Sequence, residues 1–238
     1  MRISGIVSLV TIFGLIIAAS PTICGADEVG GIAATGEFEI LTGSLVSLAM
    51  DDLRARDDRV QKADQYLAAL GFTPATEDTT DNFFGIKHAY SGEPEGSDVE
   101  QSYELYLQEY SNPDSEMTAA LGRIVLRDSA GTYTNTYTFI LEAPKAEVSS
   151  IREHYVGGSP GKLEVLEANS WWTCIIGQLP EIGEDCGDSI DKCRPATSIV
   201  GYIGCVATNC GPAFSSASIC CSCGCARWCS WAYGCCRM

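Results

Sequence analysis

The hydrophobic residues of this chain follow a helical spacing first and a strand spacing afterwards. Between Asp51 and Leu70 they recur every three or four residues, which predicts one helix, and Gly71 supplies its C-terminal stop. Hydrophobic and polar residues then alternate, which predicts four strands, at 83–90, 103–110, 121–127 and 132–141. Turn-forming residues lie between these segments, so we expect consecutive strands to pair antiparallel.

The segment 103–110 shows how one side of this sheet is composed. Tyr103, Leu105, Leu107 and Glu109 alternate with their neighbours and therefore fall on one side of a strand. A short helix is expected after the four strands, over 145–155. A helix followed by a meander of strands predicts an α+β domain with an antiparallel sheet.

From Trp171 onward the alternation ends and small or apolar residues dominate. The apolar segment 198–209 is followed by Gly211 and Pro212, which predicts a helix that ends there. Further on, cysteines recur at the spacing of one helix face, at positions 221, 225 and 229. We therefore expect a small, mainly helical C-terminal module.

Cysteine is concentrated in this module. Twelve of the thirteen cysteines lie in the last 68 residues, and none lies between Gly25 and Thr173. Such density is typical of small secreted domains. Their cores are too small to offset the entropy lost on folding, so they depend on disulfides, each of which stabilises the folded state by roughly 2–4 kcal/mol. Spacing leaves the connectivity open. The residues expected to form disulfides are Cys174, Cys186, Cys193, Cys205, Cys210, Cys220, Cys221, Cys223, Cys225, Cys229, Cys235 and Cys236.

Two other interpretations exist for the close cysteines between Cys220 and Cys225. Thiolate metal clusters use the same C-x-C spacing, but they favour a reducing compartment and few aromatic neighbours. A redox motif requires a βαβ context, which is missing around these residues. Disulfides are the favoured interpretation, and no metal is expected.

The first 26 residues predict a secretion signal. Arg2 gives a positive start, the stretch Ile6–Ala19 is almost wholly apolar, and small residues suit cleavage after Ala26. The apolar stretch is too short for a stable membrane span. We therefore expect a secreted, extracellular protein that loses Cys24 with its signal and keeps an even number of cysteines.

The net charge of −16 lies almost entirely in one part of the chain. Residues 27–170 carry 26 acidic and 10 basic side chains, whereas residues 171–238 carry 5 and 4. Phosphate contacts need Lys and Arg, so this balance argues against nucleic acid as a partner. The sequence thus divides into a signal at 1–26, an acidic α+β pro-region at 27–156 and a cysteine-rich module at 171–238.

A linker is expected between these two bodies, at 157–170. It contains Gly157-Gly158 and Pro160-Gly161, and such residues are typical of flexible connections. No two basic residues are adjacent anywhere in the chain, so a dibasic cleavage site is absent. The paired glycines are compatible with a double-glycine leader site or with an ordinary linker. Any processing is expected in this segment.

The layout of the chain resembles the halocin C8 type of archaeal bacteriocin precursor. The resemblance rests on the secretion signal, the acidic cysteine-free part, the opening Trp171-Trp172-Thr173-Cys174, the cysteines separated by Gly and Ala, and the dense tail from Cys220 to Cys236. This chain differs in lacking a twin-arginine signal and in the tighter spacing of its last cysteines. The resemblance implies that the C-terminal peptide is released as an antimicrobial and that the N-terminal part acts as its immunity protein.

Aromatic residues of the module suit such a role. Indole rings favour membrane interfaces, so a target-cell membrane or an envelope protein is the expected partner, besides the chain's own pro-region after cleavage. The alternative is that these rings fill a very small core. The candidate contact residues are Trp171, Trp172, Trp228, Trp231 and Tyr233.

Two other classes of function compete with this interpretation. For an enzyme the chain offers two histidines and no nucleophile elbow, zinc-binding helix or phosphate-binding loop. Asp51-Asp52 and Asp57-Asp58 as metal ligands, or His88 as a catalyst, are weaker interpretations than a solvated helix face and a packed strand residue. We expect neither an enzyme nor a cofactor. The remaining alternative is an unprocessed extracellular binding or surface protein with a permanent cysteine-rich tail.

Overall fold

The fold is that of a computed structural model, which describes residues 38–41, 43–91, 100–127, 133–159, 161–168, 171–182 and 186–223. Its centre is an eight-stranded sheet in the order β1-β3-β4-β5-β6-β7-β8, with the short β2 paired to β4. All pairs are antiparallel. The strands are β1 (Phe38–Leu41), β2 (Thr73–Pro74), β3 (Phe83–Ser91), β4 (Glu100–Ser111), β5 (Met117–Arg127), β6 (Tyr133–Pro144), β7 (Arg152–Ser159) and β8 (Lys162–Ala168).

The four predicted strands correspond to β3, β4, β5 and β6, and the predicted antiparallel α+β class is confirmed. The central strand β5 is buried along nearly its whole length, on both faces of the sheet. Such a strand needs a layer of other residues on each side, because both of its faces carry apolar side chains. Helices supply both layers.

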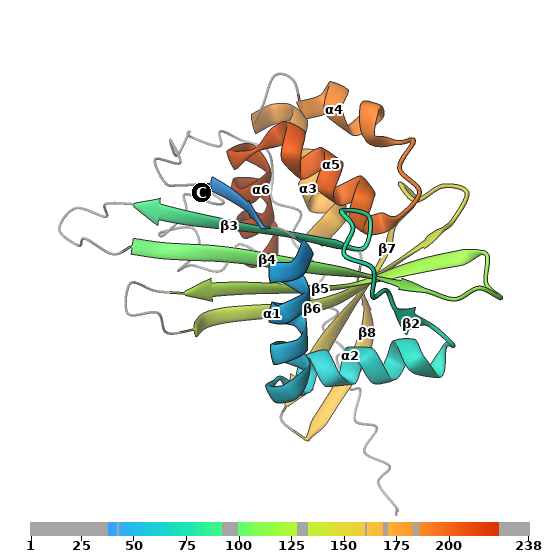
Figure 1. The fold of residues 1–238 in the computed structure, drawn as a ribbon. Coiled ribbons are helices and arrows are strands. Elements are labelled where there is room, and N and C mark those ends of the chain that lie inside the picture. The colour runs from blue at the N-terminus through green and yellow to red at the C-terminus, as the bar shows by residue number, and fades with distance from the viewer. Residues whose placement is uncertain are drawn as a thin grey trace, which may run out of the picture.

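The prediction of one helix over 51–70 is wrong in one respect, because two helices occupy this region: α1 (Gly43–Arg56) and α2 (Asp58–Ala69). They run in different directions (Figure 1). Asp57 separates them, and one of its carboxylate oxygens accepts hydrogen bonds from the main-chain N–H groups of Arg59, at 2.9 Å, and Val60, at 3.3 Å. The other oxygen pairs with the buried guanidinium of Arg123 on β5. An N-cap anchored to the sheet therefore ends one helix and starts the next.

The segment after β6 also differs from its prediction. Residues 145–150 are turns, and β7 replaces the short helix expected over 145–155. The expected linker at 157–170 forms the end of β7 and all of β8, which pair as a hairpin. Gly158 has φ 111°, and a Cβ there would lie 2.3 Å from the carbonyl oxygen of Lys162. The glycines therefore permit a tight strand pairing here instead of a flexible connection.

Four short helices make up the described part of the C-terminal module, as predicted: α3 (Trp171–Ile182), α4 (Cys186–Cys193), α5 (Ile199–Cys210) and α6 (Pro212–Cys223). Helix α5 agrees closely with the predicted 198–209 helix. Ser198 is its N-cap, and Gly211 with φ 52° follows its last residue. Both ends of α5 therefore follow from local sequence signals.

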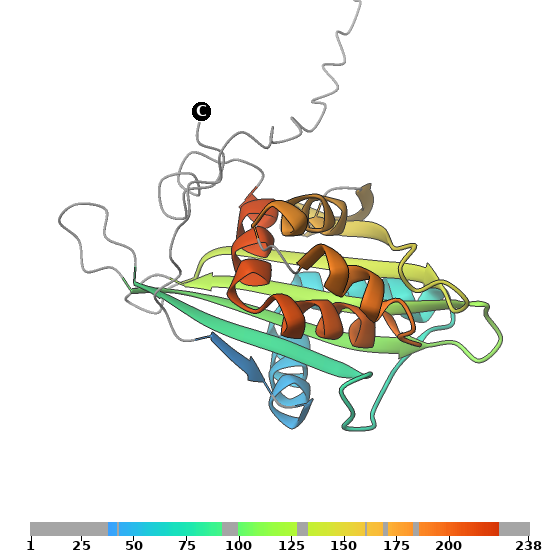
Figure 2. The same ribbon diagram turned by 90° about the horizontal axis from the view of Figure 1, so that it is seen from above.

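The elements form three layers (Figures 1 and 2). Helices α1 and α2 cover one face of the sheet and share a core with side chains such as Phe83, Leu121 and Ile140. Helices α3, α5 and α6 lie on the opposite face (Figure 2), in a larger core that includes Phe84 and Phe139. The C-terminal module is thus packed on the sheet and shares a core with it.

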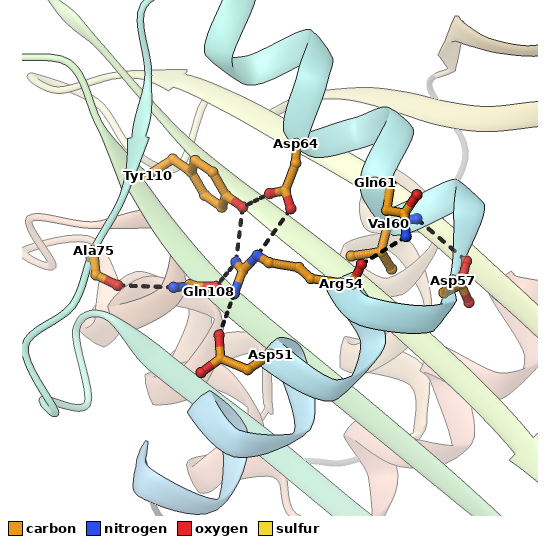
Figure 3. Close-up of polar contacts among 9 residues, drawn as sticks. All are labelled: Asp51, Arg54, Asp57, Val60, Gln61, Asp64, Ala75, Gln108 and Tyr110. Carbon is orange, nitrogen blue, oxygen red and sulfur yellow. Dashed lines mark hydrogen bonds and ion pairs between the residues drawn. The ribbon is translucent and has the colours of Figure 1, made fainter.

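A polar network holds α1 to the sheet (Figure 3). Arg54 lies between Asp51, at 3.0 Å, and Asp64 of α2, at 2.9 Å, and its guanidinium also donates to the hydroxyl of Tyr110 at 2.9 Å and to the side chain of Gln108. Burial lowers the pKa of Arg54, but the neighbouring Tyr110 and Asp64 more than offset this and leave the pKa raised. One cation therefore connects two helices and one strand.

Replacement of Arg54 by alanine is expected to lower the free energy of unfolding by about 2–4 kcal/mol, because it leaves the partly buried Asp64 without its cation. Urea unfolding of the purified protein measures this difference. The matched control is Arg56→Ala, whose pair with Asp52 is exposed and should contribute less than about 1 kcal/mol. Equal losses in both variants would contradict the structural role of the network.

Candidate functional site

The candidate site is the contact between the sheet and helices α3, α5 and α6. Its centre is Trp171, whose side chain is fully buried, with its ring 4.5 Å from that of Phe139 on β6. Trp172 meets the edge of Tyr202 on α5, with ring centroids 5.7 Å apart. A Cβ on Gly204 would lie 2.9 Å from the ring of Phe84, so glycine allows α5 to approach β3 closely. This apolar burial provides most of the attraction between the two parts.

Two buried carboxylates of the sheet meet the starts of two helices. One oxygen of Glu153 on β7 accepts hydrogen bonds from the main-chain N–H groups of Trp171, at 3.0 Å, and Trp172, at 3.1 Å. Its other oxygen accepts a hydrogen bond from the hydroxyl of Tyr137 at 2.7 Å. Helix α3 has no acidic residue in its own first turn. The sheet therefore supplies the hydrogen-bond acceptor for main-chain N–H groups that have no partner within the helix.

Glu109 on β4 likewise accepts a hydrogen bond from a main-chain N–H group at the start of α5. One of its oxygens accepts from the main-chain N–H of Val200 at 3.0 Å, and the other accepts from the hydroxyl of Thr118. The first turn of α5 also lacks an acidic residue. The N-cap Ser198 adds a second connection, because its hydroxyl donates to the carbonyl oxygen of Asp81 at 2.8 Å. Helix α5 thus begins on polar groups that come from the sheet and from the turn before β3.

A third polar contact lies deep in the apolar part. The hydroxyl of Ser218 on α6 accepts a hydrogen bond from the indole N–H of Trp171 at 3.2 Å and also contacts the hydroxyl of Tyr103 on β4. Burial raises the pKa of Tyr103, so this phenol stays neutral at ordinary pH. The contact joins α3, α6 and the sheet without a buried charge.

Both capping carboxylates resist ionisation. Burial raises the pKa of Glu109 to about 7, although the hydrogen bonds from Thr118 and from the main chain of α5 oppose this. Burial likewise raises the pKa of Glu153, against the hydrogen bonds from Tyr137 and from the start of α3. Both carboxyl groups are therefore harder to ionise than an exposed glutamate.

The predicted disulfides are found in part. Cys174 of α3 is bonded to Cys221 of α6, with Cα atoms 5.8 Å apart, and Cys193 of α4 is bonded to Cys205 of α5, at 5.7 Å. Cys220 is disulfide-bonded as well. Cys186 and Cys210 are buried thiols. The side chain of Cys223 and the residues Cys225, Cys229, Cys235 and Cys236 lie outside the described part of the chain, and their bonding stays a prediction.

Of the residues predicted to contact a target, some lie within the described part of the chain and others lie outside it. Trp171 and Trp172 are buried against the sheet in the intact chain. Trp228, Trp231 and Tyr233 lie outside the described residues. In this conformation the first two tryptophans fill the core, which was the alternative that the sequence left open. Contact of these rings with a membrane would require the module to leave the sheet.

Other polar features have structural partners. Asp51 and Asp52 pair with arginines of their own helix, and His88 is buried with its ring 5.7 Å from that of Phe38. Over the described ranges no group of three or more His, Cys, Asp or Glu side chains could hold a metal ion. A pocket of about 280 Å³ opens beside the start of α2, where Arg59 and Arg123 lie next to Asp57 and Asp58. Its mixed charges do not select one kind of ligand.

No protein-family profile, curated protein or solved structure matches this chain. Within the described part, no helix is both long and apolar enough to cross a membrane. Functional arguments therefore rest on the chain's own contacts. The strongest are the two carboxylates, which the sequence did not identify as site residues. Glu109 shared a predicted strand side with Tyr103, Leu105 and Leu107, and an acid on an apolar side was the signal that could have found it.

The raised pKa of Glu109 predicts a pH dependence of stability. Between an ordinary value of 4.5 and about 7 the folded protein keeps a proton that the unfolded chain releases. The free energy of unfolding should therefore fall as pH rises through this range, by on the order of 3 kcal/mol from this group. Glu109→Gln should remove this component, because the amide can still accept from Val200 and cannot ionise.

Urea unfolding at pH values from 4.5 to 8 measures the effect. Glu147→Gln is the matched control, since Glu147 is exposed and the slope should stay as in the parent protein. A Glu109→Gln variant with the parent's slope would show that Glu109 is ionised in the folded protein throughout.

Proposed function

We propose that this chain is the secreted precursor of a disulfide-stabilised antimicrobial peptide, as its resemblance to halocin C8-type precursors implies. In this proposal residues 171–238 are the active peptide, and residues 27–156 are a pro-region that keeps the peptide inactive and acts as its immunity protein. The single observation that carries the proposal is the way the sheet holds α3 and α5. It covers their apolar sides and places Glu153 and Glu109 at their N-termini.

The distribution of cross-links supports a separable peptide. The two disulfides with described partners lie wholly inside the C-terminal module, joining α3 to α6 and α4 to α5. Residues 27–170 contain no cysteine, so no disulfide can tie the module to the sheet. Cleavage of one peptide bond between the two parts would leave only noncovalent contacts between them.

The buried tryptophans support inhibition by the pro-region. Trp171 and Trp172 are suited to a membrane interface, but in the intact chain they lie under the sheet. A peptide held in this way cannot present these rings to a target membrane or envelope protein. Release from the sheet would expose them, and rebinding by the same sheet would protect the producing cell.

One observation favours the alternative, an unprocessed extracellular binding or surface protein. The module and the sheet share a single continuous core, and β8 runs to within a few residues of α3. Obligate parts of one domain are joined in this way. The alternative therefore predicts a single chain of full length that has no activity as a fragment.

Cleavage in vitro separates the two proposals. A protease recognition sequence inserted between Ala168 and Trp171 allows the purified chain to be cut. The precursor proposal expects the cut fragments to co-elute without inhibiting growth, and the peptide separated from them to inhibit a susceptible strain. An inactive separated peptide would favour the binding-protein alternative, as would inhibition by the uncut chain at equal strength.

The capping carboxylates should control how firmly the fragments stay together. Glu153→Ala removes the acceptor for two buried main-chain N–H groups, and a loss of about 1–3 kcal/mol corresponds to roughly 5- to 150-fold weaker association. Titration calorimetry of the cut fragments measures this change. Glu147→Ala is the control with unchanged affinity, because that side chain is exposed on the same domain.

A further inference from the structure

We propose that Cys186 and Cys210 form a further disulfide of the C-terminal module, a second cross-link between α4 and α5 beside the Cys193–Cys205 bond. Both side chains are almost fully buried, at 4% and 8% exposure, and both belong to the core beneath the sheet. The inference concerns the covalent structure of the chain and does not depend on whether a peptide is released.

The existing bond sets the register of the two helices. Cys193 ends α4, and the chain then turns back into α5, where Cys205 is its partner. Cys186 lies seven residues before Cys193, and Cys210 lies five residues after Cys205. At about 1.5 Å per residue these steps are roughly 10 Å and 8 Å. Because the helices run in opposite directions, both steps lead toward the same end of the pair.

The two thiols are in direct contact at that end. Cys210 is buried and hydrogen-bonds with the thiol of Cys186, and these conditions raise the pKa of Cys210 to about 12. Over the residues that the structure describes, no third His, Cys, Asp or Glu joins them in a group suited to a metal ion. Two adjacent thiols without a metal-binding set are suited to a disulfide.

Formation of this bond requires an oxidant, and a small-molecule disulfide such as oxidised glutathione suffices. One cysteine thiolate attacks the oxidant and forms a mixed disulfide, and the other cysteine thiolate displaces the remaining small thiol. The two protein thiols lose two protons and two electrons, and the oxidant leaves as two thiols. The attacking species is the thiolate, which is scarce at a pKa of about 12. Oxidation should therefore occur during folding, before α4 and α5 pack together.

Thiol labelling of the secreted full-length chain tests the proposal. The protein is denatured, treated with N-ethylmaleimide and analysed by peptide mass spectrometry, with and without prior reduction. We expect Cys186 and Cys210 to be unlabelled before reduction and labelled after it. Labelling of both before reduction would overturn the proposal, since both would then be free thiols in the mature chain.

Single substitutions identify the partner. Cys186→Ser should make Cys210 the labelled residue, and Cys210→Ser should make Cys186 the labelled residue, each in about one equivalent. Cys193→Ser is the matched control and should free Cys205, its partner in the structure. If Cys186→Ser frees another cysteine and leaves Cys210 blocked, the pairing is wrong. The labelling of the unsubstituted chain decides the question even if a variant fails to fold.

Discussion

The burial of the C-terminal helices against one face of the sheet is the interaction on which the rest of the structure depends. The strands β3 to β6 carry apolar side chains on both faces, and helices α1 and α2 cover only one of them. Without α3, α5 and α6 the other face, including Phe84 and Phe139, would be open to water. A patch of that kind is unfavourable in a soluble monomer and favours association with any apolar partner. The sheet and the module therefore each cover apolar surface that the other would expose to water.

Polar groups give this apolar contact its orientation. Hydrophobic burial is not directional, so it would tolerate other placements of three short helices. Glu153 and Glu109 restrict the choice, because each carboxylate can serve only a helix whose N-terminus points at it. Burial also makes both carboxylates hard to ionise, so they hold the helices at a cost that depends on pH. The two carboxylates thus fix the placement of α3 and α5 on the sheet, in a contact whose strength depends on pH.

Covalent and noncovalent stabilisation are divided between the two parts of the chain. The acidic part has no cysteine and relies on its core and on networks such as the one around Arg54. The module relies on disulfides within itself, and none of its cysteines has a possible partner in residues 27–170. A pair of bodies arranged in this way can separate after one cleavage while the smaller one keeps its cross-links. This division is what the proposed precursor function would use.

Prediction from the sequence was most successful where local signals act alone. The sequence predicted strands β3 to β6 from their alternation, because the side-chain direction in a strand depends on near neighbours. It also predicted the ends of α5 at Ser198 and Gly211, because helix capping is local as well. It failed where a distant residue decides the outcome. The break at Asp57 depends on Arg123, which lies 66 positions further along the chain. Strand β7 forms where a helix was expected, because β6 and β8 pair with it on both sides.

The sequence by itself determined the class of the fold, the acidic character of the first part and the cross-linked character of the second, because these follow from periodicity, charge and cysteine content. Only the tertiary structure decided that the two parts share a core, that Trp171 and Trp172 face inward and that two strand carboxylates cap two distant helices. Contacts between the two parts join residues as far apart in the sequence as Ser198 and Asp81, which are 117 positions apart. No local pattern encodes such a pairing, since it exists only once the chain has folded and the free energy of burial has chosen which surfaces meet.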